Sequence, residues 1–98
     1  MIDAQGQEVL VIDGDAKVQK GIEHLLRAAG LLPTVTGDPD RGIALAAEKF
    51  FAVALVDLDT PATDGGLAVI EQLRARSPKT AIVAMASRRA FDVGVQAF

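Results

Sequence analysis

The fold is decided by the stretch FFAVALVDLDTPATDGG, residues 50–66. Its apolar run ends abruptly at Asp57, a second carboxylate follows at Asp59, and a turn rich in glycine comes next. A short continuous apolar run with β-branched residues is typical of a strand buried on both faces, as in a parallel sheet covered by helices. The stretch therefore predicts a buried strand at 52–56 that presents acidic side chains at its carboxyl end.

Three other short apolar segments predict strands, at 9–12, 31–36 and 81–86. The segment 31–36 has the weakest pattern, and its Pro33 has no N–H with which to join a hydrogen-bond ladder. We therefore expect 31–36 to form a strand at an edge of the sheet.

Helical periodicity fills the segments between these strands. The first helix is expected to end before Gly30, and the second to begin at Pro39 with Asp38 as its cap. The third is expected to run from about Gly66 to Arg76. The apolar residues expected to face the core are Val18, Ile22, Leu25, Leu26 and Ala29 in the first helix, Ile43, Ala46, Ala47 and Phe50 in the second, and Leu67, Ile70 and Leu73 in the third.

Strands and helices thus alternate along the chain, and a further helix is expected to begin within 88–98. Such alternation predicts an α/β fold with a doubly wound parallel sheet, because each connection must be right-handed and must cover a face of the sheet. No linker, internal repeat or low-complexity segment divides the sequence. Residues 1–98 are therefore expected to form a single domain.

Composition narrows the possible functions. The 98 residues contain no cysteine, which excludes a disulfide framework and a thiolate metal site. A net charge of -3 and only four aromatic residues argue against direct binding of nucleic acid. The longest apolar run, 50–56, is too short to span a membrane, and the N-terminus has no signal-peptide pattern. We expect a cytoplasmic protein without a membrane partner.

Acidic residues follow two of the predicted strands: Asp13 and Asp15 the first, and Asp57 and Asp59 the third. Doubly wound sheets bind ligands beyond the carboxyl ends of their strands, where the strand order reverses. If the first and third strands are neighbours, Asp13 and Asp57 face each other. Like charges at short range raise each other's pKa, and Mg²⁺, which prefers a few carboxylates with water and phosphate, relieves their repulsion. The acids therefore predict a magnesium site.

The sequence resembles the receiver domain of two-component response regulators over nearly all of its length. VLVIDGD at 9–15 is similar to the acidic end of that family's first strand. VALVDLDTPATDGG at 53–66 is similar to its phosphoacceptor strand and turn, and AIVAMAS at 81–87 to its fourth strand. The resemblance implies a flavodoxin-like and CheY-like sheet with strand order 2-1-3-4, and a fifth strand–helix unit missing from this chain.

A function follows from the resemblance. It implies that Asp57 is the phosphoacceptor of a phosphorelay and takes the group from phosphohistidine on a sensor histidine kinase or phosphotransfer protein. Mg²⁺ would be held by Asp13, by Asp57 and by the backbone carbonyl of Asp59, with Asp15 as a weak ligand. The protein would then be a phosphoprotein of signal transduction and not an enzyme.

Three departures from the family pattern bear on this function. Gly14 replaces the second of two adjacent acids, which weakens metal binding. Met85 replaces a hydroxyl residue that reads the phosphoryl group, and Ser87 would lie about 6.5 Å further along a strand. The family's lysine in the missing fifth unit is also not represented. A degenerate receiver, which acts by protein–protein contacts alone, is therefore a second interpretation.

The missing fifth unit would leave strand 81–86 as an apolar edge, which favours pairing with another chain. We therefore expect either a homodimer through 81–86 or a natural chain that continues past Phe98.

An enzyme is the alternative to a signalling domain, and the candidate is a haloacid-dehalogenase-like phosphatase fragment. The motif VDLDT at 56–60 resembles that family's nucleophile motif, with Asp57 as nucleophile. The lone histidine, His24, lies off the predicted apolar face of its helix and is expected to be a surface residue.

Overall fold

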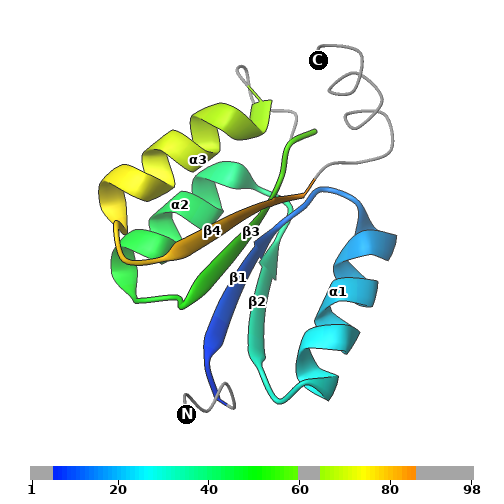
Figure 1. Ribbon diagram of the computed structural model, residues 1–98. Coiled ribbons are helices and arrows are strands. Elements are labelled where there is room, and N and C mark those ends of the chain that lie inside the picture. The colour runs from blue at the N-terminus through cyan, green and yellow to red at the C-terminus, as the bar shows by residue number, and fades with distance from the viewer. Residues whose placement is uncertain (1–5, 60–64, 86–98) are drawn as a thin grey trace, which may run out of the picture.

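The computed structural model describes residues 6–59 and 65–85, which form a parallel sheet with helices on both faces (Figure 1). The fourth helix expected within 88–98 lies outside the described residues. The strands are β1 (Glu8–Ile12), β2 (Leu32–Thr36), β3 (Val53–Asp57) and β4 (Ala81–Met85), and the helices are α1 (Ala16–Ala28), α2 (Pro39–Glu48) and α3 (Gly65–Arg76).

The sheet has the strand order β2-β1-β3-β4, and each neighbouring pair is parallel. This order confirms the doubly wound fold and the edge position of β2, whose Pro33 pairs with Val9 of β1. It also confirms that β1 and β3 are neighbours, in a register that pairs Ile12 with Val56. The residues that follow these two strands therefore emerge side by side.

The main core lies on one face of the sheet, under α2 and α3 (Figure 1). Burial of each large apolar side chain contributes about 1.5–3 kcal/mol to the free energy of unfolding. The core residues are Leu10 and Ile12 of β1, Ala54 and Val56 of β3, Ile43 and Ala46 of α2, Val69 and Leu73 of α3, and Phe51.

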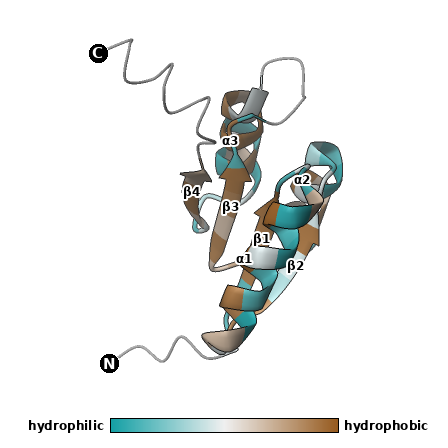
Figure 2. Cartoon of the chain, turned by 90° about the vertical axis from the view of Figure 1, so that its right-hand side faces the viewer, coloured by the Kyte–Doolittle hydropathy of each residue, from teal (hydrophilic) through white to brown (hydrophobic). Residues whose placement is uncertain are grey.

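The opposite face is covered by α1, which has no buried residue. In Figure 2, α1 lies in front of β1 and β2, while β4 lies to its side. Val11 of β1 is fully buried under the helix, whereas Leu55 of β3 is half-buried and Val83 of β4 is 48% exposed. Among the described residues, the helical cover of this face thus ends before it reaches β4.

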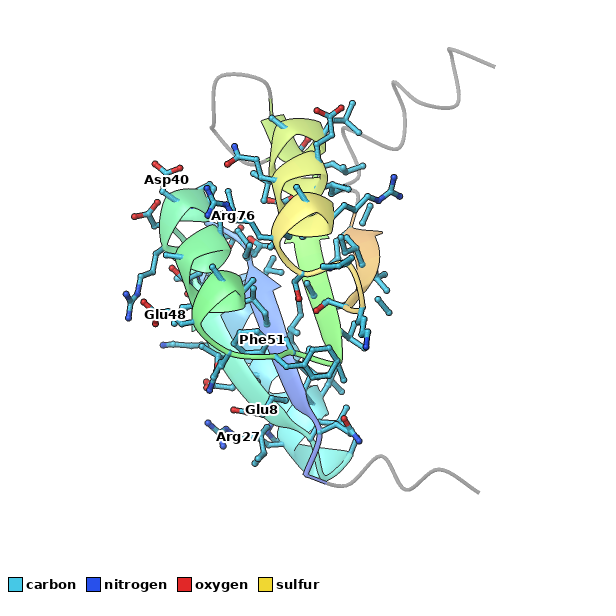
Figure 3. All side chains as sticks on the ribbon, turned by 90° about the vertical axis from the view of Figure 1, so that its left-hand side faces the viewer. Glu8, Arg27, Asp40, Glu48, Phe51 and Arg76 are labelled. Atoms are coloured by element: carbon cyan, nitrogen blue, oxygen red, sulfur yellow. The ribbon has the colours of Figure 1, made fainter. Side chains whose placement is uncertain are left out.

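The predicted core face of the second helix was wrong at its end. Phe50 is 57% exposed and Ala47 is exposed, whereas Phe51, labelled in Figure 3, is fully buried. The reason is that α2 ends at Glu48 and Lys49 is already extended, with φ -148° and ψ 162°. Helical spacing therefore stops before residue 50, and the extended chain turns the next phenylalanine inward.

The predicted faces of the other two helices were also partly wrong. Leu67 is 67% exposed, because α3 packs through Gly66, Val69 and Leu73, one residue out of phase with the predicted stripe at its start. In α1, Leu25 is 69% and Val18 is 40% exposed, and Ala29 is exposed as well, since the helix covers part of the face only.

The helix ends follow the sequence signals. Asp38 caps α2 by accepting the N–H of Asp40 at 3.0 Å, and Pro39 is the first helical residue. Gly30, which follows the C-cap of α1, has φ +82°, a conformation that glycine adopts without strain. The helix therefore ends where its sequence predicts. Within the described residues, no helix is long and apolar enough to cross a membrane.

Candidate functional site

Asp13 follows β1 directly and is held by both its backbone and its side chain. Its N–H donates to the carbonyl oxygen of Thr36 at 3.0 Å, which continues the pairing of β1 with β2. Its Oδ1 accepts the N–H of Asp15 at 2.8 Å. The residue is only 5% exposed, which is unusual for a carboxylate.

Asp57 is the last residue of β3 and is half-buried. Its Oδ1 accepts the N–H of Asp59 at 3.0 Å, which fixes the rotation of the carboxylate. The next N–H, that of Leu58, donates to the carbonyl oxygen of Met85 at 2.9 Å. The end of β3 is therefore held by hydrogen bonds to its own loop and to β4.

The neighbouring acids act on the pKa of Asp13. Burial raises the pKa of Asp13 above its ordinary value of 3.8, although the hydrogen bond from Asp15 opposes this. The negative charges of Asp57, Asp15 and Asp59 raise the same pKa further. Carboxylates from the ends of β1 and β3 thus share one electrostatic environment, which a cation would stabilise.

Asp15 has a structural role in this arrangement. It is the N-cap of α1, and its Oδ1 accepts the N–H groups of Lys17 at 2.8 Å and Val18 at 3.3 Å. The preceding residue, Gly14, is exposed, and a Cβ added there would meet no atom within 4 Å. The loop therefore has room for a further side chain at position 14.

Gly66 brings α3 against the end of β3, a contact that sequence patterns did not predict. A Cβ at this buried position would lie 2.6 Å from the Cα of Leu58 and 2.7 Å from the carbonyl oxygen of Asp57. The preceding Gly65 has φ +67°, which favours glycine. The consecutive glycines at the start of α3 were the signal in the sequence, since close backbone approach needs a residue without a side chain.

The remaining candidate residues are His24, Met85 and Ser87. His24 is exposed on α1, as expected. Met85 is the register partner of Asp57 in β4 and is half-buried, whereas Ser87 lies outside the described residues. Within 6–59 and 65–85, no three His, Cys, Asp or Glu side chains form a ready metal cage. Two carboxylates with a backbone carbonyl and water are the smaller protein ligand set that Mg²⁺ accepts.

Comparison with known proteins identifies the family. The response regulator receiver domain family matches residues 9–98. The DNA-binding transcriptional regulator NtrC of Salmonella typhimurium is 31% identical over 90 residues, which are 92% of this chain and 19% of that protein. The chain thus spans about a fifth of the length of this curated relative.

Solved structures agree with this match. The receiver domain of the sensor histidine kinase PA1611 from Pseudomonas aeruginosa, with magnesium in its active site cleft, is 26% identical with a TM-score of 0.75. The alignment covers 81% of this chain and 66% of that one. A transiently phosphorylated switch in bacterial signal transduction is 31% identical with a TM-score of 0.75, over 96% of this chain and 75% of the other.

The family match leaves the haloacid-dehalogenase-like alternative without support. It also agrees with the strand order, with the paired acids beyond β1 and β3, and with the motifs that carried the resemblance. Receiver domains are signalling modules of two-component systems that receive a phosphoryl group on an aspartate. The chain belongs to the response regulator receiver domain family.

Proposed function

We propose that Asp57 is the aspartate that receives the phosphoryl group. The observation that carries this proposal is its position: Asp57 ends the strand next to β1, half-buried and beside the acidic Asp13. Partial exposure leaves the carboxylate open to a donor protein, and the hydrogen bond from Asp59 orients it for attack. A carboxylate held in this way is a suitable nucleophile for in-line transfer.

The donor in this proposal is a phosphohistidine on a sensor histidine kinase or phosphotransfer protein. One Asp57 oxygen forms a bond to phosphorus as the bond from phosphorus to the imidazole nitrogen breaks. The electron pair of that bond stays on the nitrogen, and the product is an acyl phosphate on Asp57. Asp13 and Asp57 then face the added negative charge together, so the reaction needs a cation at this place.

Mg²⁺ is the cation that this donor set fits. Asp13 and Asp57 would supply carboxylate oxygens and Asp59 its backbone carbonyl, and Mg²⁺ would neutralise charge that develops on the phosphoryl oxygens. Asp15 contributes little, because its Oδ1 already caps α1. Gly14 offers no ligand at the neighbouring position, so the affinity for Mg²⁺ is expected to be lower than with a second acid there.

The second candidate function is a degenerate receiver that acts through protein contacts alone. Gly14 and Met85 favour it, because one supplies no metal ligand and the other cannot donate a hydrogen bond to a phosphoryl group. Its contact surface would be β4, where Ala81, Val83 and Ala84 are exposed and the five-residue strand carries no charge. A homodimer through 81–86 is the corresponding assembly, with the cytoplasm as its location.

Intact mass spectrometry separates the two functions. The purified protein is incubated with Mg²⁺ and acetyl phosphate, and one added phosphoryl group is expected in the wild type but not in Asp57→Ala. Asp40→Ala, which removes an exposed acid on α2, is the control and should retain the addition. A wild type that gains no mass while its circular dichroism shows an intact fold would exclude phosphorylation and favour the contact function.

Sedimentation velocity tests the homodimer. The wild type should sediment as a dimer at micromolar concentration, and Val83→Lys, which adds a charge to the exposed strand, should sediment as a monomer. A monomeric wild type at all concentrations would contradict the assembly without affecting the proposal for Asp57.

A further inference from the structure

We propose that Gln19 is a positioning residue, which holds the loop of Asp13 in the geometry that binds Mg²⁺. This inference rests on the proposed function, because it assigns Gln19 to the same site. Gln19 lies in the second turn of α1, is half-buried, and does not touch the phosphoryl group in that proposal.

The first observation is that the backbone of Asp13 is held on both sides. Its N–H donates to the carbonyl oxygen of Thr36 in β2. Its carbonyl oxygen accepts a hydrogen bond from Nε2 of Gln19. The two bonds attach the residue to two different elements, β2 and α1, so neither peptide group beside Asp13 is free to rotate.

The second observation is that the constrained peptide leads directly to the contact on the carboxylate. The peptide that Gln19 holds joins Asp13 to Gly14, and the N–H of Asp15 then donates to Oδ1 of Asp13 at 2.8 Å. Gly14 has the widest backbone freedom of any residue type, so it imposes no conformation on this loop. A restraint from outside the loop is therefore needed, and the Gln19 amide supplies it.

The third observation comes from the loop after β2. A Cβ at Gly37 would lie 3.2 Å from Nε2 of Gln19 and 3.6 Å from the carbonyl oxygen of Asp13. The backbone of Gly37 thus packs closely behind the Gln19 amide, and a side chain at position 37 would press on that amide. Gln19 is confined between this loop and the Asp13 peptide, which is the arrangement expected of a group that fixes a geometry.

The anchor of Gln19 is itself well defined. Its own N–H donates to the carbonyl oxygen of Asp15 at 2.9 Å, and the Asp15 side chain caps the same helix. The first turns of α1 and the acid loop therefore form one hydrogen-bonded unit. A purely structural role would be to stabilise this start of the helix, and the experiment must separate that role from positioning.

The test uses Gln19→Met, which keeps the length of the side chain and removes the donor. Gln72→Met, on the exposed surface of α3, is the matched control. Exchange of the Asp15 amide proton is measured by NMR in the metal-free protein, and Mg²⁺ affinity by NMR titration. Loss of one net hydrogen bond should speed Asp15 exchange and weaken Mg²⁺ binding by roughly fivefold each. The control should change neither.

A double-mutant cycle adds a second, independent measurement. Gly37→Ala should speed Asp15 exchange when Gln19 is present, because the new methyl group displaces its amide. The same change in a Gln19→Ala background should have no further effect, since nothing remains for the methyl group to displace. Additive effects would overturn the inference.

The outcomes also separate this inference from the proposed function. Unchanged Asp15 exchange in Gln19→Met overturns the inference. If the wild type binds Mg²⁺, faster exchange with unchanged Mg²⁺ affinity overturns it as well. Exchange that rises equally at Val18, whose N–H depends on the helix cap alone, assigns Gln19 a structural role and overturns it too. A wild type that binds no Mg²⁺ refutes the metal step of the proposed function, whereas a selective change at Asp15 would still support Gln19 as the restraint on the loop.

Discussion

Gly66 of α3 lies against the carbonyl oxygen of Asp57, so close that a Cβ at position 66 would be 2.7 Å from that oxygen. Its N–H also approaches the next carbonyl, that of Leu58, at 3.3 Å. The start of α3 therefore packs against the backbone of Asp57, the proposed phosphoacceptor. Any change that moves this helix end also moves the backbone of the site.

Gly66→Ala is expected to destabilise the protein by about 1–3 kcal/mol, because the added methyl group meets backbone atoms that cannot rotate away. Urea denaturation followed by circular dichroism measures the loss. Gly21→Ala in α1 is the control, since a Cβ there meets no atom within 4 Å. The control should stabilise the helix by up to about 1 kcal/mol. Equal stability of Gly66→Ala and the wild type would contradict the close packing at the start of α3.

Gly14→Asp is expected to strengthen Mg²⁺ binding by roughly tenfold, because it adds a carboxylate beside a divalent cation. The space for it is open, and Gly14 needs no positive φ. Isothermal titration calorimetry measures the affinity. Gly21→Asp makes the same substitution at an equally open position on α1 and should leave the affinity unchanged. Equal affinities of Gly14→Asp and wild type would argue against a metal site at this loop.

The raised pKa of Asp13 predicts a pH dependence of stability. Because the folded protein binds this proton more tightly than the unfolded chain, the contribution is fully present below the ordinary pKa of 3.8. It is lost as the pH rises through the raised pKa of the folded state. The ionised Asp13 of the neutral protein is therefore destabilising in the absence of metal.

Asp13→Asn should accordingly increase the free energy of unfolding at about pH 7 and have little effect at about pH 3. Asparagine can still accept the N–H of Asp15 through its side-chain oxygen, so the loop is preserved. Urea denaturation at the two pH values is the measurement. Added Mg²⁺ should raise the stability of the wild type more than that of the variant. A variant less stable than wild type at neutral pH without metal would contradict the electrostatic account.

The loop between α3 and β4 offers a test of a buried hydrogen-bond chain. Thr80 is buried, its Oγ1 donates to the carbonyl oxygen of Phe51 at 2.7 Å, and the Ser77 hydroxyl lies 2.6 Å away. Thr80→Val keeps the shape and removes the donor, so it should cost about 1–3 kcal/mol. Thr80→Ser keeps the hydroxyl and should cost less. Thermal unfolding compares the two, and the opposite order would show that the methyl group matters more than the hydrogen bond.

The sequence predicted the order of elements and the convergence of the acids better than it predicted the buried faces of helices. Asp13 and Asp57 could be placed together because parallel strands of neighbouring position end at the same edge of a sheet. Phe50 and Leu67 were misassigned because periodicity describes a helix interior, whereas α2 ends at Glu48 and the phase of α3 is set by the contact of Gly66.

Roles that depend on a neighbouring loop could not be predicted from the pattern either. Gln19 lies six residues after Asp13 and acts on its carbonyl oxygen only because α1 begins at once after the acid loop. The sequence predicts Asp15 as a weak metal ligand, and the structure shows that its side chain also caps that same helix. Capping is a local preference of aspartate, and the short distance between strand and helix places Asp15 at the position where it can cap.

The helix that carries these contacts, α1, is the one helix among the described residues that has no buried residue. In native-state hydrogen exchange, segments with little buried apolar surface open at a lower free energy than the core. Amides of α1 should therefore exchange through a partial unfolding that leaves β1, β3 and the core under α2 and α3 closed. Because Gln19 lies in α1 and Asp15 caps it, such an opening would release the acid loop while the fold persists. Any ligand that binds the loop would then slow exchange across the entire helix.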